Sequence, residues 1–188
     1  MPHTLEHIGA LGFKSSKLRG ELILTDNLKI IEGGAFNDAS GLYGTFYMPQ
    51  KIEHLGENAF CGLGNNLVGD IVIPQSMTHI PGGAFRLNFA PSGTNLILHD
   101  GVVSIGDSAF ANTRIRNIID WPESLQFIEK NAFWSVYMIN GNFKFPPNIK
   151  KITDGAFRYN HISGELVLPE SMTSIDAVFN CTDISSVV

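Results

Sequence analysis

Phenylalanine recurs along the 188-residue chain at a nearly constant interval in the low twenties. The eight residues of this series are Phe13, Phe36, Phe60, Phe85, Phe110, Phe133, Phe157 and Phe179, and the six from Phe36 to Phe157 each follow an alanine. Such a period indicates stacked supersecondary units, each too small to bury its own apolar face. The chain is therefore expected to form a solenoid, an architecture that makes an ordinary enzyme pocket unexpected.

Each unit also has a slot, usually occupied by proline, at a fixed distance before the phenylalanine, as Pro49 stands before Phe60 and Pro74 before Phe85. In the units that end at Phe36 to Phe157 this proline slot holds Thr25, Pro49, Pro74, His99, Pro122 and Pro146, and Pro169 follows. Length varies only between a phenylalanine and the next slot. We expect the constant segments to stack in register and the variable ones to form loops along one edge.

Apolar residues one and three positions before the slot predict a short strand with one face inward, as in Ile71-Val-Ile73. Proline suits the end of this strand because it cannot donate to a ladder. Apolar residues three and six positions after the slot fit either a loose helical turn or a second strand. We favour a strand, because segments such as Val102-Val-Ser-Ile105 contain few good helix formers. One helical turn should then direct each phenylalanine into a buried column of offset or edge-on rings.

Glycine occupies the position five before the slot in most units: Gly20, Gly44, Gly69, Gly141 and Gly164, with Thr94 and Asn117 as exceptions. Glycine there predicts a corner with a positive φ angle or a close backbone approach. A phosphate-binding loop is the competing interpretation, but such a loop opens a helix, whereas here a proline-terminated strand follows.

These combined features resemble the BspA-type leucine-rich repeat family of bacterial and protozoan surface proteins. The resemblance rests on Ile71-Val-Ile-Pro74, on Met77-Thr-His-Ile80 with Gly83-Ala-Phe85, and on Val102-Val-Ser-Ile-Gly-Asp-Ser-Ala-Phe110. The cysteine that such repeats often carry three residues after the phenylalanine is missing. The resemblance implies a right-handed horseshoe, mainly β with short helical turns and with a parallel sheet on one face. Residues 1–188 would be one domain of about seven to eight repeats.

The same resemblance implies a secreted or cell-surface protein that is not an enzyme and that mediates adhesion or binds a host, matrix or other surface protein. It supplies no catalytic or ligand-binding residues. The last residues fall inside an expected strand. We therefore expect the chain to be part of a longer array, or its ends to associate with another copy.

Strand alternation predicts which residues face outward and could bind a partner. The row four before the slot is Glu21, Thr45, Asp70, Asn95, Ile118, Asn142 and Glu165, and the row two before it is Ile23, Tyr47, Val72, Ile97, Asp120, Lys144 and Val167. Contiguous apolar residues, here Ile23, Tyr47, Val72 and Ile97 in successive units, are typical of an interaction surface. The alternative is that β-branched residues occupy these positions because they favour strands. A carbohydrate-binding surface, formed by Tyr47 and the polar row, is the second functional hypothesis.

The remaining features support no cofactor, metal or catalytic site. A net charge of −5 with 16% charged residues gives no basic footprint for nucleic acid, and no apolar run is long enough to span a membrane. His54 and His79 occupy equivalent positions in adjacent units, but two imidazoles without a third ligand make a poor zinc site, so a surface pair is expected. Cys61 and Cys181 lie in distant units, which makes a disulfide between them improbable.

Overall fold

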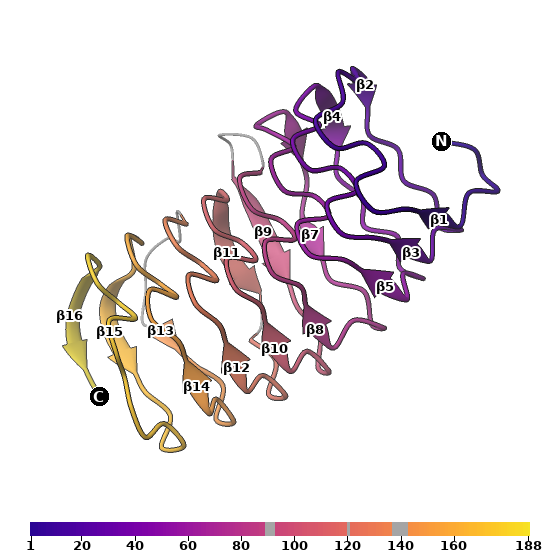
Figure 1. Ribbon diagram of the computed structural model, residues 1–188. Coiled ribbons are helices and arrows are strands. Elements are labelled where there is room, and N and C mark those ends of the chain that lie inside the picture. Colours follow the sequence, from indigo (N-terminus) through magenta and orange to yellow (C-terminus); the bar gives the residue numbers. More distant parts are fainter. Residues whose placement is uncertain (89–92, 120, 137–142) are drawn as a thin grey trace.

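The computed structural model describes residues 1–88, 93–119, 121–136 and 143–188 as a solenoid of parallel strands, with the two termini at opposite ends (Figure 1). The strands form two rows along the solenoid, joined by turns. The first row, which precedes the proline slot, contains β2 (Gly20–Glu21), β4 (Leu42–Thr45), β6 (Leu67–Val68), β7 (Ile71–Val72), β9 (Thr94–Ile97), β11 (Ile115–Ile119), β13 (Phe143–Lys144), β15 (Ser163–Val167) and β16 (Asp183–Val187).

The second row follows the slot and contains β1 (His7–Ile8), β3 (Ile30–Ile31), β5 (His54–Leu55), β8 (His79–Ile80), β10 (Ser104–Ile105), β12 (Phe127–Ile128) and β14 (Lys151–Ile152). This row confirms the prediction of a second short strand in the units up to the one that ends at Phe157; the last unit, from Pro169 to Phe179, has no such strand. The parallel sheet expected on one face is thus accompanied by another on a second face. Within both rows every strand pairs in parallel with the equivalent strand of a neighbouring unit, for example β10 with β8 and β12.

The phenylalanine column forms the centre of the core. Phe36, Phe60, Phe85, Phe110, Phe133 and Phe157 are fully buried. Neighbouring rings along the column lie 5.2 to 5.9 Å apart between centroids and are nearly parallel, with interplanar angles of 4° to 20°. The offset arrangement is therefore observed within the column and the edge-on arrangement is not. Edge-on contacts come from the first row instead, where Phe46 meets Phe60 at 86° and Trp121 meets Phe133 at 78°.

The segment around each phenylalanine is a hydrogen-bonded turn, and the described residues contain no helix. Its backbone N–H groups alternate in direction, as the unit of Phe36 shows. The N–H groups of Gly34, Phe36 and Asp38 donate to carbonyl groups of the next unit, each at 2.8 Å. The intervening Ala35 and Asn37 donate to carbonyl groups three residues earlier within the turn. The turns therefore form a third ladder along the solenoid, which a helical turn with all its N–H groups in one direction could not provide.

This alternation explains the residues on either side of Ala-Phe. The positions two before and two after the phenylalanine adopt positive φ in nearly every unit, for example 61° at Gly34 and 58° at Asp38. Glycine, asparagine and aspartate tolerate this left-handed conformation better than other residues do. The recurrent glycine or asparagine before Ala-Phe is thus required by the third ladder.

The predicted glycine corners are confirmed where the structure describes them. Gly20, Gly44, Gly69 and Gly164 have φ angles of 141°, 108°, 98° and 90°. A Cβ atom on Gly44 would lie 2.7 Å from Cγ of Glu21 in the preceding unit, so the close approach is present as well. Gly141 lies outside the described residues.

Asparagine side chains bond to the backbone between the turns and the first row. Asn160, buried three residues after Phe157, accepts a hydrogen bond from the N–H of Val136 at 2.7 Å and donates to the carbonyl of Phe133 at 2.9 Å. Asn88 makes the same two contacts with Leu63 and Phe60. In these two units the asparagine three residues after the phenylalanine links the unit to the one before it.

Candidate binding surface

The outward face of the first row carries an exposed apolar strip over β2, β4, β6 and β7. Five side chains, each 37% to 54% exposed, make up this apolar strip: Ile23, Tyr43, Tyr47, Val68 and Val72. They project from strands whose alternate residues, such as Leu22, Phe46 and Ile71, are buried in the core. The strip thus lies on a backbone that is held rigidly by parallel pairing and by the phenylalanine column.

Three of these five residues were expected from the sequence, and two were missed. Tyr43 and Val68 lie six residues before the proline slot, one step further along the same alternation that identifies Tyr47 and Val72. In the pairing of β4 with β6, Thr45, which lies four residues before its proline slot, is opposite Val68, which lies six residues before the next slot. The two strands are therefore offset by two residues relative to their slots. A shift of two preserves which face each side chain occupies. Extending the outward rows by one step would therefore have found both residues.

Beyond the strip the expected outward residues are less exposed. Asp70 and Lys144 are exposed, whereas Asn95, Ile97, Glu165 and Val167 are half-buried. Asp120 and Asn142 lie outside the described residues. The structure therefore presents the apolar face mainly in the first half of the array and a more polar one in the second.

The prediction that Ile118 faces outward is wrong. In the pairing of β11 with β9, Asn117 lies opposite Asn95 and Ile118 lies opposite the buried Leu96. An irregularity between Ile115 and Asn117 shifts the register, and Ile118 packs against the core. Counting back from the proline slot assumed an unbroken strand, and one extra residue moves every side chain to the other face.

With Asn117 in the outward row, three polar residues form a hydrogen-bonded ladder beside the strip. The Asp70 carboxylate accepts hydrogen bonds from the side-chain amide and the backbone N–H of Asn95, both at 3.0 Å. Asn117 donates to the side-chain carbonyl of Asn95 at 3.0 Å. The ladder uses much of the hydrogen-bonding capacity of these side chains within the protein itself.

Tyr47 combines an exposed ring with a fixed hydroxyl group. Its hydroxyl donates a hydrogen bond to the carboxylate of Asp26 at 2.7 Å. This bond, together with burial and the negative charge of Asp26, raises the pKa of Tyr47 above its ordinary value, because deprotonation would remove the bond and bring two negative charges together. A hollow of about 320 Å³ adjoins this pair, lined also by His3, Ile23 and Asn27.

The other predicted chemical features are placed as follows. His54 and His79 are both exposed and line one shallow hollow of the second row. Within the described parts of the chain, no three histidine, cysteine or acidic side chains come together in a metal-binding arrangement. Cys61 is buried and Cys181 exposed, and both are free thiols; burial raises the pKa of the Cys61 thiol. No helix of the described residues is long and apolar enough to cross a bilayer.

A parallel β-solenoid with a stacked phenylalanine core and a strand, corner, strand and turn in each unit defines the chain as a leucine-rich repeat protein. The family described as BspA type leucine rich repeat region matches residues 1–90 and 88–188, with six copies of the repeat. The chain belongs to this family.

Among solved structures, a leucine rich cell surface protein from Faecalibacterium prausnitzii has a similar fold, with a TM-score of 0.57 and 20% sequence identity. The likeness covers 100% of this chain and 58% of that protein's chain, so the chain spans less than two thirds of its structural neighbour. No curated protein matches the chain significantly. Family and neighbour together show that the chain is a leucine-rich repeat module.

Proposed function

We propose that this chain is a non-catalytic recognition module of a secreted or cell-surface protein, and that it binds a host, matrix or other surface protein through the apolar strip. The observation that carries the proposal is the strip itself: five neighbouring apolar side chains remain exposed on a sheet whose inner face is fully packed. The family and the cell-surface neighbour support the location.

The composition of the strip supports a protein partner. Tyrosine is enriched at binding hot spots because it supplies a large apolar contact together with a polar atom, at little cost in conformational entropy. Tyr43 lies on β4 and Tyr47 lies two residues after its end, at the middle of the strip. The hydrogen bond from Tyr47 to Asp26 holds one ring in place before any partner arrives. A preorganised aromatic residue loses less entropy on binding.

The experiment compares two substitutions on the strip with one elsewhere. Tyr47→Asp and Val72→Asp place a charge within the apolar surface, whereas Gln75→Asp places the same charge at the exposed corner after Pro74. Each variant is screened by surface plasmon resonance against a panel of purified matrix and cell-surface proteins. We expect the strip variants to weaken binding to a captured partner at least about tenfold and Gln75→Asp to leave it unchanged. Equal binding by all three variants would refute the proposed surface.

A second candidate function is carbohydrate binding at the same end of the array. The hollow beside Tyr47 favours it, because an exposed aromatic ring next to Asp26 and Asn27 can stack on a sugar and accept or donate hydrogen bonds. A glycan array separates the candidates: selective binding of a neutral sugar that Tyr47→Ala abolishes would favour this function over protein recognition.

A further inference from the structure

The basic residues of this acidic chain are concentrated in one segment of the repeat. The six residues that follow each phenylalanine of the column run from the turn toward or into the next first-row strand, and we call these segments, apart from residues 89–91 and 137–139 outside the described chain, the connecting edge. They contain all five arginines and two lysines of the 13 basic residues: Lys14, Lys17, Arg19, Arg86, Arg114, Arg116 and Arg158. Of the 18 acidic residues they contain only Asp38 and Asp183. With seven basic and two acidic residues, the connecting edge has a net charge of +5. The remaining six basic and 16 acidic residues give the rest of the chain a net charge of −10.

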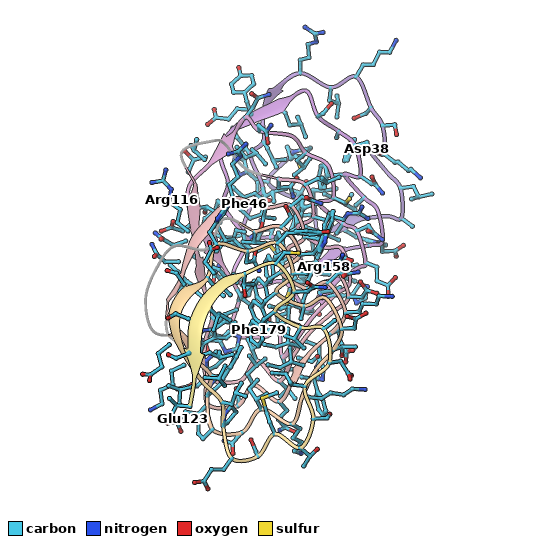
Figure 2. The ribbon with its side chains drawn as sticks, turned by 90° about the vertical axis from the view of Figure 1, so that its left-hand side faces the viewer. Asp38, Phe46, Arg116, Glu123, Arg158 and Phe179 are labelled. Atoms are coloured by element: carbon cyan, nitrogen blue, oxygen red, sulfur yellow. The ribbon has the colours of Figure 1, made fainter. Side chains whose placement is uncertain are left out.

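Stacking of the units gathers these segments along one side of the solenoid. Figure 2 shows Arg116 on the flank next to the first row, and Arg158 on the flank next to the turns. The stem of Arg116 lies across Gly93, where a Cβ atom would collide with it. Arg158 lies over the ring of Tyr159, with 4.8 Å between the guanidinium carbon and the ring centroid, and donates to its hydroxyl at 3.0 Å. Both side chains are thus oriented by the fold.

Residues of the connecting edge line a hollow of about 350 Å³, within the usual size range of ligand sites, which begins near 300 Å³. It is lined by groups of three kinds. Arg114 contributes a positive charge, Leu87 an apolar surface, and Asn65, Asn112 and Ser135 contribute amides and a hydroxyl. This combination suits a ligand with a negative group, a ring of hydroxyls and an apolar face.

Leu87 and Tyr159 are unusual for the positions they occupy. Both lie two residues after a phenylalanine, with φ near 60°, where the other units place serine, aspartate, asparagine, glycine or cysteine. A bulky side chain is strained in this conformation, because its Cβ atom crowds the following carbonyl oxygen. Burial does not offset this strain, because the two side chains remain 43% and 45% exposed. Trp134 meets Tyr159 edge-on at 6.1 Å and precedes Ser135 of the hollow, so aromatic surface continues along the edge.

We propose that the connecting edge binds a linear anionic polysaccharide, with one acidic sugar in the hollow. Arg114 pairs with the sulfate or carboxylate of that sugar, and the amides and hydroxyl of the lining bond its hydroxyl groups. Leu87 lies under its apolar face. Tyr159 and Trp134 provide a stacking surface for the chain beyond it, and Arg86 and Arg158 meet further acidic groups.

The charge balance and the lining favour this ligand over nucleic acid or an acidic protein. Nucleic acid binding depends on dense basic contacts to closely spaced phosphates, whereas the rest of this chain carries a net charge of −10. An acidic peptide would pair with the arginines and could bond the asparagines through its backbone, but aspartate and glutamate side chains offer no ring face to the exposed Leu87 and Tyr159. The proposal concerns a different side of the solenoid from the apolar strip and is independent of it.

The test uses the full 188-residue chain and biolayer interferometry with four immobilised probes: heparin, polygalacturonate, polyglutamate and single-stranded DNA. We expect binding to one of the two polysaccharides that weakens with added salt and is tighter than binding to polyglutamate or DNA. Arg114→Gln should weaken it about tenfold, the effect of losing one charge-assisted contact. Lys150→Gln on the second row, which removes the same charge near Phe127, should leave it unchanged.

Leu87→Asn separates a binding role from a structural one, because the two roles predict opposite outcomes. Asparagine tolerates the left-handed conformation, so this variant should unfold at a higher temperature than the wild type while binding the polysaccharide more weakly. The proposal is overturned if neither polysaccharide binds at low salt, if DNA or polyglutamate binds more tightly, or if Lys150→Gln weakens binding as much as Arg114→Gln does. Because the apolar-strip variants Tyr47→Asp and Val72→Asp leave this edge intact, their outcome bears only on the protein-binding function.

Discussion

Replacing a central phenylalanine of the column by alanine tests whether ring stacking between units stabilises the solenoid. Phe110 is fully buried and lies between two column neighbours, Phe85 at 5.4 Å and 4° and Phe133 at 5.4 Å and 13°. Truncation in a packed core costs about 3–5 kcal/mol, so Phe110→Ala should lower the free energy of unfolding by about 4 kcal/mol. For a domain of this size that corresponds to a fall of about 10 °C in Tm.

Two comparison variants isolate the contributions to this loss. Phe110→Leu keeps an apolar side chain but removes both ring contacts, and should cost about 1–3 kcal/mol. Phe13→Ala removes a half-buried ring that has one stacking neighbour in the column, Phe36, and should cost less than Phe110→Ala. The free energy of unfolding is measured by urea titration followed by far-UV circular dichroism. A cost for Phe110→Ala no greater than that for Phe13→Ala would show that the column does not carry the stability assigned to it.

Three further predictions concern contacts between units. Asn160→Ala leaves a buried N–H and a buried carbonyl of the preceding unit unpaired and should cost about 2–4 kcal/mol in urea unfolding, so that a loss below about 1 kcal/mol would contradict it. Gly56→Ala places a methyl group against the backbone of the preceding unit, whereas Gly33→Ala meets its nearest atom only at 3.5 Å, so only the first should cost about 1–3 kcal/mol or prevent folding. The Glu32 carboxylate accepts hydrogen bonds from His7 and from a backbone N–H, and these bonds lower its pKa. Its stabilisation is complete above the unfolded-state pKa of about 4.3 and is lost as the pH falls through the lower folded-state value. Glu32→Gln should therefore destabilise the chain at neutral pH, with a difference that shrinks on acidification; a constant difference would contradict the assignment.

The sequence predicted the elements that depend on spacing along one unit. The constant distance from slot to phenylalanine placed the column, and the alternation around Ile71-Val-Ile73 placed the first-row strands and the exposure of Ile23, Tyr47 and Val72. Each of these features repeats from unit to unit, so the pattern could be recognised without knowing how the units touch.

Predictions were wrong, or could not be made, where the outcome depended on contact between units. The expected helical turn is replaced by a ladder in which Gly34 and Asp38 donate to the next unit. Ile118 faces the core because the pairing of β11 with β9 is irregular, which counting within one unit could not show. The hollow on the connecting edge brings Asn65, Leu87 and Arg114 together from three successive units, so no single motif identifies it.

Sequence alone determined that this chain is a solenoid with a phenylalanine core, because each apolar position recurs at a fixed distance from the proline slot and must be buried against its neighbours. Only the tertiary structure decided how the backbone of one unit bonds to the next, where the register shifts, and which variable residues meet on the surface. The reason is that burial of an apolar position repeats with the unit. Hydrogen bonding between units and the meeting of loop residues depend instead on pairs of segments from different units, about which the pattern within one unit says nothing.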